Sequence, residues 1–176
     1  MEQLENWLLR IQNLSERSER EWRKYFMRNK VWVEDLDSLG YFLTSSHESV
    51  VYKGYSEKEI YKAKKNRTEG DFAGVIKDAI LHNKLFPDTS YSLVGFTDYA
   101  EGVRVILKQN YIEGQHPGND QIIEYLNNNG YEVEREGNMI TARKGGLMAC
   151  DIYSKNAIIT DGKIFIVDCN IKCTEI

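Results

Sequence analysis

The decisive stretch, residues 148–170, reads MACDIYSKNAIITDGKIFIVDCN. Its centre is Asp161-Gly162 between two apolar runs, AIIT and KIFIV, and this dipeptide strongly favours a two-residue type I′ turn. A hairpin of this kind brings the residue before its first strand close to the residue after its second. We therefore expect Asn156 and Asp168 to lie side by side, with Asp151 one loop away.

These three polar side chains suit magnesium-assisted phosphoryl transfer. Asn156 and Asp168 supply oxygen ligands of the kind that Mg²⁺ prefers. Asp151 can accept the proton of an incoming hydroxyl group. A surface hairpin with acidic turn residues is the alternative interpretation, but the hairpin combined with the second Asp favours the catalytic one.

The spacing of these residues resembles the end of a protein-kinase active site, where H-R-D-x-x-x-x-N precedes a hairpin and D-F-G. Asp151 and Asn156 match the D and N of the catalytic loop, and Asp168 matches the metal-binding Asp. Two departures are visible. Ala149-Cys150 replaces His-Arg, and Cys169-Asn170 replaces Phe-Gly.

Composition sets broad limits on the kind of protein. A length of 176 residues suits one domain or two small lobes. Hydrophobic residues make up 41% and charged residues 28%, as in ordinary globular proteins. The net charge of −4 argues against nucleic acid as a partner. No apolar run approaches about 18 residues, so no membrane partner is expected. The three cysteines fit no disulfide framework, which suits a reducing cytoplasm.

Residues 1–38 are expected to form a helical extension. An apolar stripe with helical spacing begins it and continues after a polar stretch at Ser15–Arg20, which predicts a break between two helices. Packing on the body of the same protein is the favoured interpretation. The stripe consists of Leu4, Trp7, Leu8, Ile11, Trp22, Tyr25 and Phe26.

Three short β runs follow, at 39–44, 49–54 and 59–65. A serine-rich loop separates the first two, and in a kinase-like interpretation Ser45 and Ser46 would hold phosphate oxygens. The third run carries lysines on one face. Lys62 is the residue expected to pair with the α- and β-phosphates, and Lys64 is the fallback because a shift of two residues keeps the same face.

A strongly periodic helix is predicted at 71–86, packed on an antiparallel sheet. Asp78 and Glu69 are candidates for an acidic partner of Lys62. Strands are predicted at 91–97 and 104–112, and backbone groups from Gln109 to Ile112, those of Gln109 and Tyr111 included, are expected to hydrogen-bond an adenine.

The remaining elements complete an α+β pattern. A helix is predicted at 119–129 with Gly130 as its C′ residue, and strands follow at 131–136 and 138–144. The expected domains are 1–38, the helical extension; 39–112, an N-lobe-like sheet plus helix; and 113–176, a truncated C-lobe that holds the catalytic loop and the metal hairpin.

Two phrases, LHNKLFPDTSYSLVGF (81–96) and DIYSKNAIITDGKIFIVDCNI (151–171), are together similar to the small kinase-like domains of polyvalent proteins encoded by phages and mobile elements. The resemblance covers roughly residues 39–172. It implies a compact two-lobed kinase-like fold that binds ATP and Mg²⁺, and it supports roles for Lys62, Asp151, Asn156 and Asp168. It supplies no known substrate. The chain ends where an ordinary kinase would begin its activation segment.

Three functions follow from these patterns. The first is an ATP- and Mg²⁺-dependent phosphotransferase. The second is a kinase-like binding module without turnover, acting on a protein partner. The third and weakest is a metal-dependent nuclease, based on Asp161 and on the run Asp168–Lys172.

Overall fold

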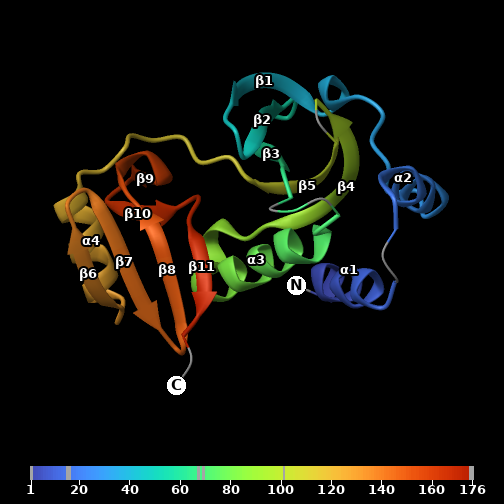
Figure 1. Ribbon diagram of the computed structural model, residues 1–176. Helices are drawn as coiled ribbons and strands as arrows, with labels where there is room; N and C mark the ends of the chain where they lie inside the picture. Colours follow the sequence, from blue (N-terminus) through green and yellow to red (C-terminus); the bar gives the residue numbers. More distant parts are fainter. Residues whose placement is uncertain (1, 15–16, 67, 69, 101, 175–176) are drawn as a thin grey trace. The chain divides into compact units, whose positions relative to one another are not determined.

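The computed structural model describes residues 2–14, 17–66, 68, 70–100 and 102–174 (Figure 1). The chain divides into two compact units, one of residues 1–80 and 91–111 and the other of residues 81–90 and 112–176. Helices and antiparallel sheets occur in both, which confirms the predicted α+β class.

A five-stranded antiparallel sheet organises the first unit. Its strand order is β1-β2-β3-β5-β4, so β3 lies at the centre. The first three strands match the predicted runs, and the last two form the predicted hairpin. The strands are β1 (Gly40–Ser45), β2 (Ser49–Gly54), β3 (Glu59–Lys64), β4 (Ser92–Tyr99) and β5 (Gly102–Asn110).

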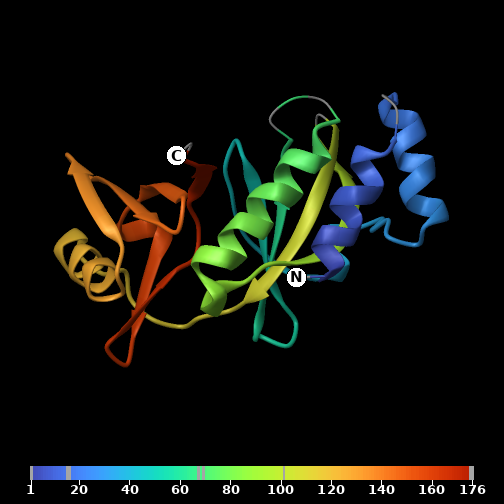
Figure 2. The same cartoon turned by 90° about the horizontal axis from the view of Figure 1, so that it is seen from below.

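Helix α3 (Phe72–Leu85) covers one face of this sheet with its first nine residues, which belong to the first unit. Asp71 caps the helix, because its Oδ1 accepts a hydrogen bond from the N–H of Gly74 at 2.9 Å. The buried face of α3 packs with side chains of β4 and β5 in one apolar cluster. Figure 2 shows α3 running along the sheet.

The N-terminal extension forms α1 (Glu2–Gln12) and α2 (Glu19–Arg28). The predicted break at Ser15–Arg20 overlaps the interval between them, but Glu19 and Arg20 already belong to α2, and residues 15–16 lie outside the described part of the chain. Phe26 of α2 stacks on Phe96 of β4 with ring centroids 3.6 Å apart. Trp7 of α1 packs on the same phenylalanine pair. The predicted packing of the extension on the body of the protein is confirmed.

Strand β1 is an edge strand with an unusual apolar surface. Tyr41 is 60% exposed and Phe42 is 56% exposed. The pairing with β2 shifts between Phe42 and Thr44, which places Leu43 in a bulge.

The second unit contains a four-stranded sheet of order β11-β8-β7-β6 with α4 packed against β6 and β7 (Figure 1). A separate two-stranded hairpin is formed by β9 and β10. The elements are α4 (Asn119–Asn128), β6 (Glu132–Glu136), β7 (Met139–Lys144), β8 (Leu147–Ile152), β9 (Ala157–Thr160), β10 (Lys163–Ile166) and β11 (Asn170–Cys173).

Backbone dihedral angles confirm the predicted turn chemistry of this unit. Asp161 and Gly162 have φ values of 50° and 75°, as a type I′ turn requires. Gly130 follows α4 with a φ of 75°. A second pair of positive φ values, at Gly145 and Gly146, joins β7 to β8. This hairpin was not predicted, although Gly-Gly is a signal for it.

Candidate active site

Asp151 lies in a β-bulge near the end of β8. In the β7–β8 pairing, Ile152 opposes Ile140 and Ala149 opposes Ala142, so Cys150 and Asp151 share one residue opposite them. A bulge of this kind bends its strand and re-aims a side chain. Asp151 has a φ of 61°, which Asp adopts more readily than most residues. The fold therefore presents this carboxylate differently from the regular residues of the strand.

Asn156 follows directly, at the end of the 3₁₀ turn η3 (Ser154–Asn156) and before β9. Its side-chain Nδ2 donates a hydrogen bond to the carbonyl oxygen of Asp151 at 2.9 Å. Because a carbonyl only accepts, this bond identifies the nitrogen side of the amide. The other side, Oδ1, is then the atom of this amide that can ligate a cation.

Asp168 lies between β10 and β11, beside Asn156. The carbonyl oxygen of Asn156 accepts hydrogen bonds from the N–H groups of Val167 at 2.9 Å and Asp168 at 3.4 Å. The carboxylate of Asp168 accepts from the N–H of Cys169 at 3.1 Å. The backbone thus places Asn156 and Asp168 side by side, as the hairpin predicted.

The pairing of β11 with β8 brings the segment that holds Asp168 close to Asp151 as well. Asn170 pairs with Cys150, so the register directs the chain before β11 toward Asp151. Asp151, Asn156 and Asp168 therefore form one continuous set within the second unit.

The donor atoms of this set fit a magnesium ion. Mg²⁺ is usually held by one or two carboxylates and completes its shell with water and substrate phosphates. Asp168 and the Oδ1 of Asn156 offer two oxygen atoms of the kind that could fill these positions. No group of three His, Cys, Asp or Glu side chains in the described residues forms a closed metal cage. The set therefore suits a cation that also needs a phosphate ligand.

Lys62 lies on the central strand β3 of the first unit and is buried, with 7% of its surface exposed. Its Nζ donates a hydrogen bond to the hydroxyl of Tyr91 at 2.9 Å. Lys64, two residues along, places its Nζ 5.4 Å from the centroid of the same ring. The two lysines share one face, as predicted.

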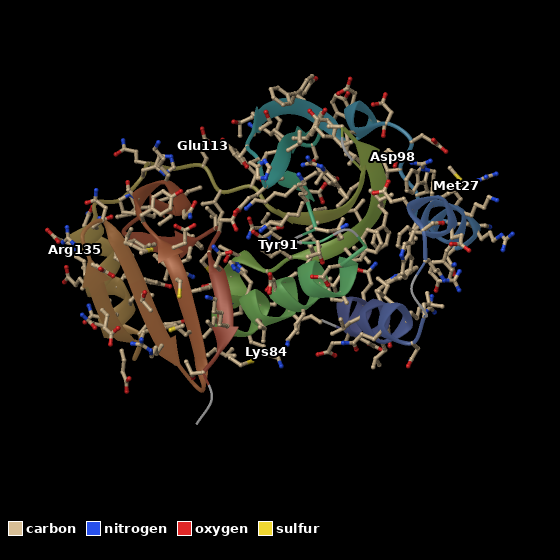
Figure 3. The ribbon with its side chains drawn as sticks, viewed as in Figure 1. Met27, Lys84, Tyr91, Asp98, Glu113 and Arg135 are labelled. Atoms are coloured by element: carbon tan, nitrogen blue, oxygen red, sulfur yellow. The ribbon has the colours of Figure 1, made fainter. Side chains whose placement is uncertain are left out.

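Tyr91 was not predicted as a site residue. It precedes β4 and is labelled in Figure 3. It is 29 residues from Lys62 in the sequence, and no local pattern links the two. Of the acidic candidates for Lys62, Asp78 lies half-buried on α3, and Glu69 falls outside the described residues.

The loop after β1 is closed by its own hydrogen bonds. The hydroxyl of Ser46 accepts from the N–H groups of Glu48 at 3.2 Å and Ser49 at 3.1 Å. The N–H of Ser46 donates to the carbonyl of Ser49 at 2.8 Å. Phosphate binding by Ser46 would therefore compete with these bonds. Ser45 is the last residue of β1 and pairs with Val50. Phosphate binding by the two serines stays a prediction.

The end of β5 bears on the predicted adenine site. Gln109 pairs with Ile60 of β3, and the N–H of Tyr111 donates to the carbonyl of Lys58 at 2.9 Å. Because backbone groups alternate in direction along a strand, Gln109 also turns its backbone toward β3, whereas Asn110 turns its own away. Strand β4 begins at Ser92, opposite Lys108, and does not reach that far. The alternation shifts the expected adenine contact from Gln109 and Tyr111 to Asn110.

A comparison with family models finds the serine/threonine/tyrosine kinase found in polyvalent proteins, matched over residues 15–175. The chain belongs to this family. No curated protein and no solved structure was found to match the chain.

Membership of the polyvalent-protein kinase family identifies a kinase-like domain and implies nucleotide and metal use in general.

A nuclease site at this hairpin would require Asp161 and Asp168 to lie close together. Asp161 forms the tip of the β9–β10 turn, whereas Asp168 follows the far end of β10. The four residues of β10 span roughly 13 Å at about 3.3 Å per residue. Asp161 and Asp168 therefore cannot ligate one cation together.

No membrane partner was expected for this chain. None of the helices in the described part of the chain combines the length and the apolar composition that crossing a bilayer requires.

Proposed function

We propose that this chain is an ATP- and Mg²⁺-dependent phosphotransferase that acts on a hydroxyl group. The observation that carries the proposal is the hydrogen-bonded set of Asp151, Asn156 and Asp168, in which a carboxylate on a bulge adjoins two oxygen ligands. Membership of a kinase family supports the same chemistry.

Asn156 and Asp168 are the residues that would hold the magnesium ion, through Oδ1 and a carboxylate oxygen. When bound, Mg²⁺ neutralises charge on the phosphate oxygens. Lys62 would place its ammonium group on the α- and β-phosphates. Its burial against Tyr91 limits its rotation, so the charge is held in position before nucleotide binds.

Asp151 would accept the proton of the attacking hydroxyl. The acceptor oxygen forms a bond to the γ-phosphorus while the bond from that phosphorus to the bridging oxygen of ADP breaks. The proton passes to the carboxylate of Asp151. Asn110 would contact the adenine through its backbone.

Calorimetric titration with ATP, in the presence and absence of Mg²⁺, tests the metal site. Asp168→Ala should lose the magnesium-dependent part of nucleotide affinity. The matched control is Asp161→Ala, which removes a carboxylate from the same hairpin at its far end. Loss in the control variant alone, or equal affinity in all three proteins, would contradict the assignment of Asp168.

Turnover separates this proposal from a second candidate, a kinase-like binding module that acts on a protein partner. The internally bonded loop at Ser46 and the replacement of His-Arg by Ala149-Cys150 favour that candidate. A phosphate-transfer assay on the unaltered protein decides between them. Nucleotide binding without hydrolysis or transfer would support the binding module, and absence of nucleotide binding would overturn both.

A further inference from the structure

We propose that His82 and Thr89 are positioning residues that hold Asp168 in place for metal binding. This inference rests on the metal-binding role proposed for Asp168. Neither residue contacts the cation in this assignment. They act through the chain on both sides of Asp168, and all of the contacts involved lie within the second unit.

Asp168 lies in a short link that has little support from strand pairing. Strand β10 ends at Ile166 and β11 begins at Asn170, and the two strands belong to different sheets. The carbonyl of Asn156 holds the N–H groups of the link from one side. A buried set of polar side chains holds it at its two ends.

Thr89 holds the first end of the link. It is 1% exposed, and its hydroxyl donates a hydrogen bond to the carbonyl of Ile166 at 2.7 Å. That carbonyl belongs to the last residue of β10, two positions before Asp168. The bond therefore fixes the point where the chain leaves the hairpin.

His82 holds the other end. It is 2% exposed, and its Nε2 lies 3.2 Å from the carbonyl oxygen of Thr89 and 3.0 Å from the hydroxyl oxygen. Because a carbonyl only accepts, Nε2 carries the proton and Nδ1 is an acceptor. Nδ1 lies 3.7 Å from the Sγ of Cys169, whose thiol can donate to it. Cys169 directly follows Asp168.

These bonds form a closed circuit around Asp168. They run from Cys169 through His82 and Thr89 to Ile166, and the chain itself completes the ring through Asp168. A histidine that only fills space in a core would not need to join both ends of a four-residue segment. Outer partners of this kind orient metal ligands, and their loss typically lowers metal affinity about tenfold to a hundredfold.

The test uses Mn²⁺, whose binding to the full chain is followed by electron paramagnetic resonance, together with hydrogen exchange at the amides of Val167 and Asp168. Thr89→Val keeps the shape of the side chain and removes the hydroxyl. It should weaken Mn²⁺ binding about tenfold and speed exchange at both amides. Thr89→Ser keeps the hydroxyl and should restore both properties.

Thr97→Val is the matched control. Thr97 is another buried threonine, 1% exposed, whose hydroxyl donates to a backbone carbonyl in β4 of the other unit. The Thr97→Val variant should leave Mn²⁺ affinity and the rate of hydrogen exchange at the amides of Val167 and Asp168 unchanged. Cys169→Ala opens the circuit at its half-buried end and should change both readouts in the direction of Thr89→Val, even if the valine variant folds poorly.

The possible failures are distinct. If the unaltered protein binds Mn²⁺ and both Thr89→Val and Cys169→Ala bind it equally well, the positioning role is wrong and the metal site stands. If Thr97→Val weakens Mn²⁺ binding as much as Thr89→Val, the effect is general loss of stability and the positioning role is again wrong. If the unaltered protein binds no Mn²⁺, the proposed metal site and this inference fail together.

Discussion

The side-chain amide of Asn156 is hydrogen-bonded to the backbone carbonyl of Asp151 at 2.9 Å. This bond joins the proposed metal ligand to the proposed general base, which lies five positions earlier in the chain. The same Asn156 holds the N–H of Val167 through its own carbonyl. A displacement of the catalytic loop would therefore move the ligand and the base together.

The first prediction concerns Asp151. Asp151→Asn should leave ATP binding nearly unchanged and lower transfer about a hundredfold to ten-thousandfold, the usual contribution of a general base. Asn tolerates the positive φ of this position, so thermal stability should be unaffected. Calorimetry, a transfer assay and thermal denaturation check the three parts.

Asp161→Asn is the control for this prediction. Asp161 also has a positive φ, but it lies at the tip of the β9–β10 turn. The Asp161→Asn variant should transfer phosphate at the rate of the unaltered protein. Equal losses in both variants would show that Asp151 has no special role.

The second prediction decides between the two lysines of β3. Lys62→Met removes the ammonium group but keeps an unbranched apolar chain in a buried position. A charged hydrogen bond is worth about 1.5–3 kcal/mol, so ATP should bind roughly tenfold to a hundredfold more weakly. Lys64→Met should have a smaller effect. Calorimetry measures the ATP affinity of both variants. A larger loss of affinity in Lys64→Met than in Lys62→Met would contradict the assignment of Lys62 to the phosphates.

The third prediction separates adenine binding from phosphate binding. Asn110→Pro removes a backbone N–H on the side of β5 that β4 does not reach. ATP should bind more weakly, whereas inorganic triphosphate should bind as before. Asn110→Ala keeps the N–H and serves as the control. An equal effect of both substitutions on ATP would show that the side chain, and not the backbone, is responsible.

The fourth prediction is a pH dependence of stability. Hydrogen bonds from Lys108, with Nζ 2.6 Å from the carboxylate, and from Tyr61 hold the pKa of Glu59 below its ordinary value of 4.5. Because the folded-state pKa is the lower one, the stabilisation is complete above the unfolded-state pKa and is lost as pH falls through the folded-state value.

Lys108→Met should therefore lower the free energy of unfolding by a constant amount at neutral pH. The difference from the unaltered protein should shrink as the pH falls below about 4.5, the ordinary pKa of Glu. Urea denaturation of both proteins between neutral and acidic pH measures this difference in the free energy of unfolding. Lys24→Met, at an exposed position on α2, is the control. A difference that stayed constant into acid would rule out the Glu59 pair as its source.

Local signals in the sequence predicted much of the fold. The Asp161-Gly162 turn and the alternating runs around it are short-range features, so the β9–β10 hairpin could be found without its surroundings. Strand β8 was harder, because Leu147–Ile152 has no clean alternation and contains a bulge at Asp151. Strand β11 is only four residues long and depends on β8 for its pairing.

Contacts between distant residues could not be predicted in this way. The bond from Lys62 to Tyr91 depends on the order in which β3, β5 and β4 assemble. His82 was not predicted as a site residue either. Its neighbours Thr89 and Cys169 come together only when the second unit folds. Polar side chains that meet across long sequence separations leave no periodic pattern in the sequence, so their contacts could not be predicted from it.

The left-handed backbone at Asp151 also limits how this gene can change. Aspartate codons differ by one nucleotide from those of asparagine and glycine, and both of these residues accept a positive φ. A single base change can therefore remove the carboxylate while the protein still folds. The bulge therefore gives this lineage a short mutational route from a chain that carries the proposed general base to one that lacks it and keeps its shape.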